Sequence, residues 1–129
     1  MYLFIDPSLM STIRLVLLSG TISREHVFEV SNRELLNVIK EALERENIVL
    51  TDLEGIVVLI GEGRFSNTRI ASVVGNTLSY ALNIPVVATT RGHEPTQSTV
   101  HTFFSPSNIT MYITPTYSGE PHIGIPTQF

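Results

Sequence analysis

The chain has 129 residues, of which 43% are hydrophobic and 16% charged, and its formal net charge is −4. These values predict one globular domain with a buried core and exclude a disordered chain. The absence of cysteine excludes disulfides, thiolate nucleophiles and cysteine-ligated metals, and the few scattered Lys and Arg residues argue against tight, direct binding of nucleic acid.

The N-terminal third of the chain is predicted to form three strands, mostly antiparallel. Apolar residues fill 2–6, residues 12–19 alternate before a fully apolar stretch, and a turn at Gly20 leads into 22–30. One face of the second strand is expected to be only partly exposed, because apolar side chains point to both of its sides.

A helix is expected next, from an N-cap at Ser31 or Asn32 to about Asn47. Its apolar residues recur at helical spacing and define a core face, whereas its charged residues define a solvated face. On that solvated face, Glu41 and Arg45 are spaced for an ion pair. The charged run therefore predicts a surface rather than a site.

The middle of the chain combines a buried strand with a glycine-containing loop. Residues 56–60 are continuously apolar, as in a strand covered on both faces, and Gly61 and Gly63 allow the backbone to turn sharply. A second helix and a strand at 84–89 follow. This order predicts an α/β fold, a mixed sheet with flanking helices and a right-handed crossover.

The second helix is expected to begin at a Ser66 cap and to end at Asn83. Gly75 inside it costs about 1 kcal/mol relative to alanine, which indicates a close approach of another backbone. That neighbour is either the chain's own sheet or a second chain. For the second alternative, the predicted partner or dimer interface consists of Ile70, Ala71, Val74, Gly75, Leu78 and Ser79.

The last third of the chain changes in character. Residues 91–108 are rich in Ser, Thr, Pro and Gly and read as irregular chain, with a short strand as one interpretation of 100–104. A terminal strand is predicted at 109–114, paired with this domain or a dimer mate, and an extended tail at 118–129. We expect one domain, 1–129, in which 91–129 is a polar segment with a terminal strand and tail.

The glycine-containing loop and second helix carry a family resemblance. The stretch GEGRFSNTRI at 61–70, followed by YALNIPV at 80–86, resembles the GPGSFTGLRIG…AYALNIPL stretch of the TsaB (YeaZ-type) family. The N-terminal FIDPS at 4–8 is similar to the family's IDTS. The resemblance covers 1–90 and departs from the family at Glu62, Arg64 and Asn67.

This resemblance implies one ribonuclease-H-like lobe of the actin/Hsp70/sugar-kinase fold, without the family's second lobe. It also implies a noncatalytic subunit, with no cofactor, that supports a TsaD-like partner in making threonylcarbamoyladenosine (t6A) on tRNA. The implied partners are the TsaD-like protein, with a TsaE-like ATPase as a further candidate, in a homodimer or heterodimer, and tRNA is contacted only indirectly.

The competing hypothesis is a small-ligand or nucleotide-binding enzyme that uses the loop at 61–69. Its candidate anion-binding residues are Gly61, Gly63, Arg64, Ser66 and Arg69. Glu62 opposes an anion there, and Arg69 is equally suited to bond a neighbouring carboxylate. Asp6 lies where actin-like ATPases place a metal-and-phosphate carboxylate, but Pro7 follows it, so a structural role in the turn is the favoured interpretation.

No metal site or catalytic residue is predicted. His93 and Glu94 do not begin a zinc motif because Pro95 disfavours a helix there, and no Ser nucleophile has its usual glycine context. The chain also shows no secretory signal and no apolar stretch of membrane-spanning length, so a cytoplasmic protein without membrane contact is expected.

Overall fold

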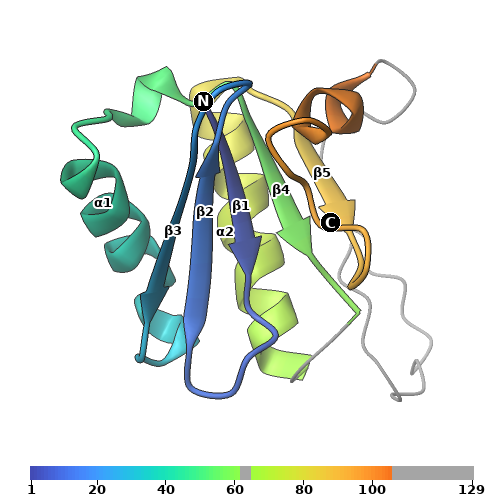
Figure 1. Cartoon of the computed structure of the whole chain (residues 1–129). Helices are drawn as coiled ribbons and strands as arrows, with labels where there is room; N and C mark the ends of the chain where they lie inside the picture. The colour runs from blue at the N-terminus through green and yellow to red at the C-terminus, as the bar shows by residue number, and fades with distance from the viewer. Residues whose placement is uncertain (62–64, 106–129) are drawn as a thin grey trace.

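The computed structural model describes residues 1–61 and 65–105, apart from the side chains of Phe65 and Ser66. Its centre is a five-stranded sheet with the order β3-β2-β1-β4-β5 (Figure 1). The strands are β1 (Tyr2–Asp6), β2 (Ile13–Leu18), β3 (Ser23–Phe28), β4 (Gly55–Leu59) and β5 (Val86–Thr89). The helices are α1 (Leu35–Arg45) and α2 (Phe65–Leu82), with short 3-10 helices η1 (Asn32–Glu34), η2 (Leu50–Asp52) and η3 (Val100–Phe104).

The sheet is mixed, as predicted. The strands β1, β4 and β5 run parallel to one another, whereas β1 with β2 and β2 with β3 pair antiparallel. All residues of β4 are buried, in agreement with its unbroken apolar sequence. The three parallel strands therefore end at one edge of the sheet.

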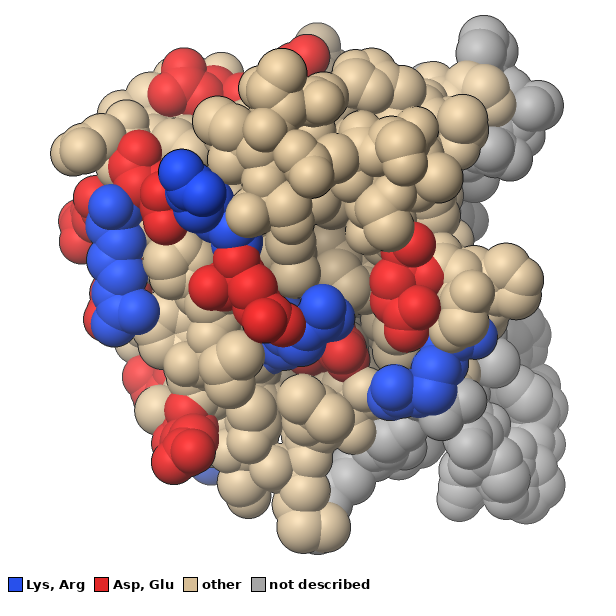
Figure 2. Space-filling view, in the orientation of Figure 1, with Lys and Arg blue, Asp and Glu red and all other residues tan. Residues whose placement is uncertain are grey.

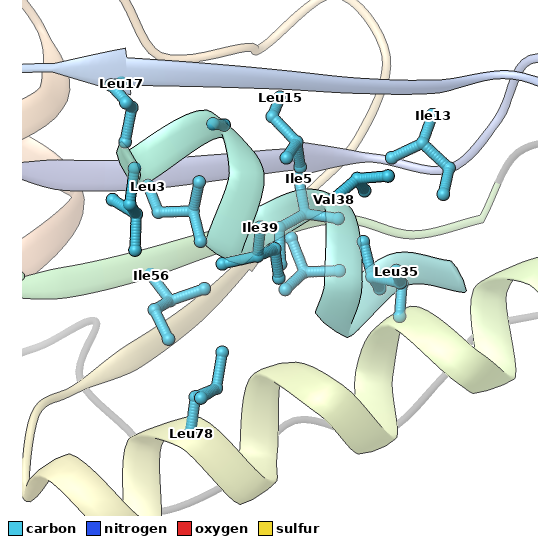
Figure 3. Close-up of a cluster of buried hydrophobic side chains, with 14 of the residues drawn as sticks. Leu3, Ile5, Ile13, Leu15, Leu17, Leu35, Val38, Ile39, Ile56 and Leu78 are labelled. Atoms are coloured by element: carbon cyan, nitrogen blue, oxygen red, sulfur yellow. The ribbon is translucent and has the colours of Figure 1, made fainter. Parts of the chain in front are cut away.

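One face of the sheet is covered by both long helices. Their apolar sides and the facing strand residues form one continuous core (Figure 3). The fully buried members with the largest side chains are Leu3, Ile5, Ile13, Leu15, Leu17, Leu35, Ile39 and Ile56. On the solvated side of α1, Glu41 and Arg45 form the predicted ion pair.

The opposite face of the sheet has its own apolar cluster. It consists of the buried residues Phe4, Val16, Leu18, Val57, Leu59 and Val100, with Tyr2, Phe103 and Phe104 packed against them. We call this set the second core. The prediction that this side of β2 is partly exposed is wrong for Val16 and Leu18, because they belong to the second core and are buried.

The segment that completes the second core is η3, not a strand at 100–104. The ring of Phe104 stacks on that of Tyr2, with 4.8 Å between centroids, and it fills the space above Gly55. A Cβ on Gly55 would lie 2.6 Å from Cε1 of Phe104. Glycine at the start of β4 thus makes room for an aromatic ring from η3. Burial and the nearby charge of Glu54 raise the pKa of Tyr2.

The ends of α2 match the sequence only in part. Asn83 follows the helix with a φ of 56°, and the amide of Ile84 donates to the carbonyl of Ser79 at 3.1 Å, so the helix ends where predicted in a left-handed cap. It begins at Phe65, however, which places Ser66 inside the first turn and not at the N-cap.

Other predictions fall beyond the described part of the chain. The strand at 109–114 and the tail at 118–129 lie outside the described residues, so the division into one lobe and a C-terminal segment stays a prediction. Among the described residues, no helix has the length and apolar character needed to cross a membrane.

Candidate functional site

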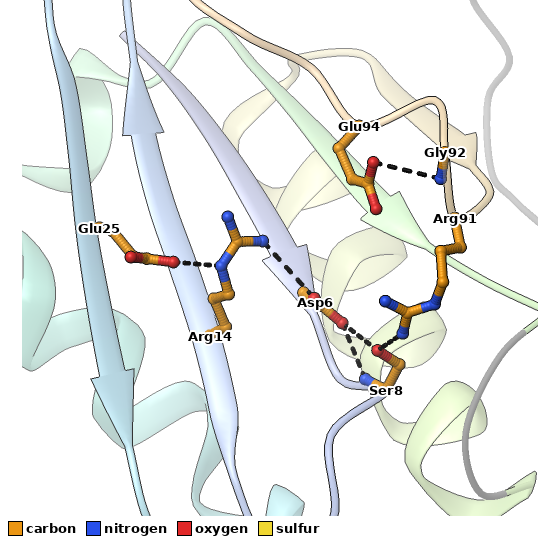
Figure 4. Close-up of polar contacts among 7 residues, drawn as sticks. All are labelled: Asp6, Ser8, Arg14, Glu25, Arg91, Gly92 and Glu94. Atoms are coloured by element: carbon orange, nitrogen blue, oxygen red, sulfur yellow. Dashed lines mark hydrogen bonds and ion pairs between the residues drawn. The ribbon is translucent and has the colours of Figure 1, made fainter.

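The carboxyl ends of the parallel strands meet at one edge of the sheet, which is where open α/β sheets bind ligands. Asp6 ends β1, Gly61 follows β4 with a φ of 82°, and the turn at 90–93 follows β5. The topology thus brings residues far apart in the sequence to one place (Figure 4). This edge is the candidate site for a small ligand.

Asp6 is buried, with 3% of its surface exposed, and its carboxylate is held by neighbours. Its Oδ1 accepts the backbone N–H of Ser8 at 2.9 Å and the hydroxyl of Ser8 at 2.6 Å. Its Oδ2 lies 3.5 Å from Nη1 of Arg14. Both oxygens therefore have partners inside the protein, which supports the interpretation that Asp6 stabilises the turn after β1.

Arg14 is placed opposite Asp6 by the pairing of β1 with β2. Its guanidinium also pairs with Glu25 on β3 and stands over the ring of Phe4, 5.8 Å from the centroid. The aliphatic part of Arg14 can therefore border the second core while its charge faces two carboxylates. Arg14 joins the three strands β3, β2 and β1 at this edge.

Arg91 reaches the same place from the turn after β5, whereas Arg14 reaches it from β2, on the opposite side of β1. The amide of His93 donates to the carbonyl of Thr90 at 3.0 Å, and Gly92 has a φ of 93°, as at the third position of a type II turn. This turn directs Arg91 so that its Nη2 donates to the hydroxyl of Ser8 at 2.5 Å. The amide of Gly92 donates to Glu94 at 3.2 Å.

The charges at this edge nearly balance. Among the described residues, two arginines, Arg14 and Arg91, and three carboxylates, those of Asp6, Glu25 and Glu94, lie in this part of the structure. Figure 2 shows basic and acidic side chains side by side across this face, without a large surface of one sign. The described residues of this edge therefore do not supply the clustered positive charge that favours a phosphate chain.

The predicted anion-binding loop lies only partly within the described residues. Gly61 has the positive φ that a sharp turn after β4 requires, and Asn67 Nδ2 donates to the carbonyl of Pro7 at 3.3 Å, which ties α2 to the turn after β1. Gly63 and Arg64 lie outside the described residues, as does the side chain of Ser66. Arg69 is exposed on α2.

The stripe of small residues on α2 packs against the chain's own sheet. Ala71, Leu78 and Ser79 are buried, and a Cβ on Gly75 would lie 2.9 Å from Cγ2 of Val58. The alternative that Gly75 relieves crowding against the sheet is therefore the correct one. Of the predicted interface residues, Ala71, Gly75, Leu78 and Ser79 are thus buried within this chain, while Ile70 and Val74 are half-buried at the border of the stripe.

A different face of α2 is exposed. Val73 is 58% exposed and Tyr80 is 90% exposed, with Thr77 and Ala81 exposed beside them. The sequence 70–82 contains no charged residue. We call Val73, Thr77, Tyr80 and Ala81 the outer face of α2. These four side chains are open to solvent.

Three residues of the candidate site were missed from the sequence: Ser8, Arg14 and Arg91. Arg14 was the one charge in an otherwise apolar strand, and the hairpin register that sets it opposite Asp6 was a usable signal. No such local signal exists for Arg91, because its partner Ser8 is 83 positions away. Within residues 1–61 and 65–105, no three His, Asp or Glu residues lie together as a metal ion would need.

Comparisons with known proteins agree with this fold. The family model described as "TsaD: tRNA N6-adenosine threonylcarbamoyltransferase" matches residues 21–97. YeaZ from Pseudomonas aeruginosa is similar with a TM-score of 0.62 and 26% sequence identity, over 69% of this chain and 43% of that chain. The resemblance to YeaZ-type proteins and the ribonuclease-H-like, actin/Hsp70-type fold are thereby confirmed.

A second solved structure gives the same result. It is described as an uncharacterized protein with similarity to peptidase YeaZ from Pseudomonas aeruginosa, and it matches with a TM-score of 0.62 and 26% identity. The match covers 69% of this chain and 42% of the other. The chain therefore spans less than half the length of either structure.

Proposed function

Because the chain belongs to the family described as "TsaD: tRNA N6-adenosine threonylcarbamoyltransferase", we propose that it acts in t6A modification of tRNA as a noncatalytic subunit. In this proposal it binds a TsaD-like protein, and that partner performs the transfer. A TsaE-like ATPase and a cytoplasmic location belong to the same proposal. The chain meets tRNA only through its partner, since its formal net charge is −4.

The observation that carries the proposal is the outer face of α2. Exposed apolar surface can mark a site where a partner binds, and aromatic residues are enriched at such sites. Tyr80 is almost fully exposed here, and Val73 lies two turns before it on the same helix. We place the TsaD-like partner on this face and move the interface away from the buried stripe around Gly75.

The carboxyl edge of the sheet supports the noncatalytic part of the proposal. Asp6 has both oxygens engaged by Ser8 and Arg14, and the charges of the described residues around it nearly cancel. A carboxylate used for metal or phosphate chemistry needs an oxygen directed at the ligand. Asp6 instead serves the turn between β1 and β2.

The proposal is tested by capture of the partner from the native source. We expect the tagged chain to co-purify a TsaD-like protein, and Tyr80→Glu or Val73→Glu to lower the yield of that protein at least tenfold. Val49→Glu is the matched control, because Val49 is 60% exposed in the loop after α1 and lies outside the outer face. Undiminished capture by both α2 variants would contradict this interface. A dimer of the chain alone, lost in the same variants, would assign the face to self-association.

The alternative, a nucleotide-binding enzyme that uses the loop at 61–69, is tested separately. Titration of the purified chain with ATP, with and without Mg²⁺, should give no saturable binding. Saturable, magnesium-dependent binding would favour the alternative over a noncatalytic subunit.

A further inference from the structure

Five side chains form an unbroken series along the carboxyl edge of the sheet. Glu25 on β3 pairs with Arg14 on β2, Arg14 with Asp6 at the end of β1, Asp6 with Ser8, and Ser8 with Arg91 after β5 (Figure 4). We call this series the edge network. It runs from β3, the outermost strand on one side of the sheet, to the turn that follows β5, the outermost strand on the other side.

Ser8 is the link on which the series depends. A hydroxyl has one proton, and Ser8 gives it to Oδ1 of Asp6 at 2.6 Å, while its oxygen accepts from Nη2 of Arg91 at 2.5 Å. The backbone amide of Ser8 bonds to the same carboxylate oxygen at 2.9 Å. Asp6 thus fixes both the backbone and the hydroxyl of Ser8, and Ser8 fixes an acceptor for Arg91.

The bond between Arg91 and Ser8 also crosses a strand. The sheet order places β4 between β1 and β5, so a contact between the loops that follow β1 and β5 spans the carboxyl end of β4. It holds the turn at 90–93 close to the connection between β1 and β2. That turn leads on through Pro95 to η3, which covers the second core.

The middle of the edge network is shielded from water, and its ends are not. The side chain of Asp6 is 5% exposed, that of Arg14 31% and that of Glu25 50%. Hydrogen bonds and ion pairs in series polarise one another, and a buried member strengthens this effect because water screens it less. A change in the charge of Glu25 at one end of the edge network can therefore affect the bond of Arg91 at the other end.

We propose that the edge network is a latch, which holds the turn at 90–93 onto the connection between β1 and β2 and transmits a change at Glu25 to Arg91. Loss of the Glu25 charge removes one of the two carboxylates that hold Arg14, so Arg14 pulls more strongly on Asp6 and weakens the bonds from Asp6 to Ser8. A ligand or partner that binds Glu25 would therefore release the turn at 90–93. The inference does not depend on the proposed function.

The test is amide hydrogen exchange and ¹⁵N NMR on the full chain. In Glu25→Gln, we expect the amide resonances of Ser8 and Gly92 to shift and the amide of Gly92 to exchange at least about twofold faster. Glu29→Gln is the matched control, because Glu29 is an exposed glutamate immediately after β3. It should leave both amides unchanged. Changes in Glu25→Gln that stay within β2 and β3 would overturn the latch.

A second variant tests whether the links act in series. Ser8→Ala removes only the hydroxyl, and we expect it to speed exchange at Gly92 more than Glu25→Gln does. In the double variant, Glu25→Gln should add nothing at Gly92 to the effect of Ser8→Ala, because the connection is already broken. Additive effects, or an unchanged Gly92 in Ser8→Ala, would overturn the proposal.

Discussion

Gly75 of α2 lies so close to Val58 of β4 that a Cβ on Gly75 would stand 2.9 Å from Cγ2 of Val58. The same Cβ would stand 3.6 Å from Cγ2 of Val86 on β5. Because valine is stiff about χ1, neither methyl can move away cheaply. The glycine in the middle of α2 thus sets how closely the helix approaches the two parallel strands beneath it.

Substitutions at Gly75 should therefore destabilise the protein. Gly75→Ala gains about 1 kcal/mol of helix propensity but overpacks the contact with Val58 at a typical cost of about 1–3 kcal/mol, and Gly75→Leu costs more. Urea unfolding measures both. Val58→Ala combined with Gly75→Ala should recover stability relative to Val58→Ala alone. If Gly75→Leu is as stable as the parent chain, the packing account of Gly75 fails.

The raised pKa of Tyr2 predicts a loss of stability in alkali. Burial and the charge of Glu54 disfavour the phenolate in the folded protein, so the folded pKa lies above the ordinary value of 10.0. The resulting contribution is fully present below that value and is lost as the pH rises through the folded pKa. Urea unfolding at about pH 8 and about pH 11 should show this loss in the parent chain and less of it in Tyr2→Phe. Equal losses in the two proteins would show that Tyr2 is not the group responsible.

Truncation after Thr90 should cause aggregation. The shortened chain loses Val100, Phe103 and Phe104, which cover the apolar residues of β1, β2 and β4 in the second core. An exposed apolar sheet face of this kind associates with other copies. Light scattering and ultracentrifugation of the truncated chain test this expectation. A soluble monomer with unchanged stability would mean that η3 contributes little to the fold.

Asp6 should be dispensable for nucleotide chemistry, because its oxygens are held by Ser8 and Arg14. The purified chain should hydrolyse ATP no faster than a heat-treated control. Asp6→Ala should instead lower stability, by about 1–3 kcal/mol, because Ser8 and Arg14 lose their acceptor. Magnesium-dependent hydrolysis that disappears in Asp6→Ala would overturn the noncatalytic assignment.

The sequence predicted the elements of this fold well because each has a local cause. The unbroken apolar run at 56–60 and the helical spacing in α1 and α2 reflect what each segment buries, and Asn83 marks a backbone position that few residues tolerate. The predictions for β1 to β5 are confirmed within a few residues at their ends.

Spatial relationships were harder to predict from the sequence. The segment 100–104 forms η3 and not a strand, and its residues Val100, Phe103 and Phe104 pack on the second core, a contact with distant strands that the local sequence does not reveal. Gly75 indicated a close neighbour without saying which one, so both the chain's own sheet and a second chain remained as alternatives. Arg91 and Ser8 meet only because the sheet order places the loops after β1 and β5 at one edge.

The central claim is that this chain supports t6A formation by a partner without catalysing it. The most direct measurement is the t6A content of tRNA, by mass spectrometry of its nucleosides, after incubation with the TsaD-like partner and its substrates. We predict that t6A forms with the partner and this chain together, falls at least tenfold with Tyr80→Glu, and stays at background with the chain alone. Equal t6A formation with and without the chain, or formation by the chain alone, would contradict the account.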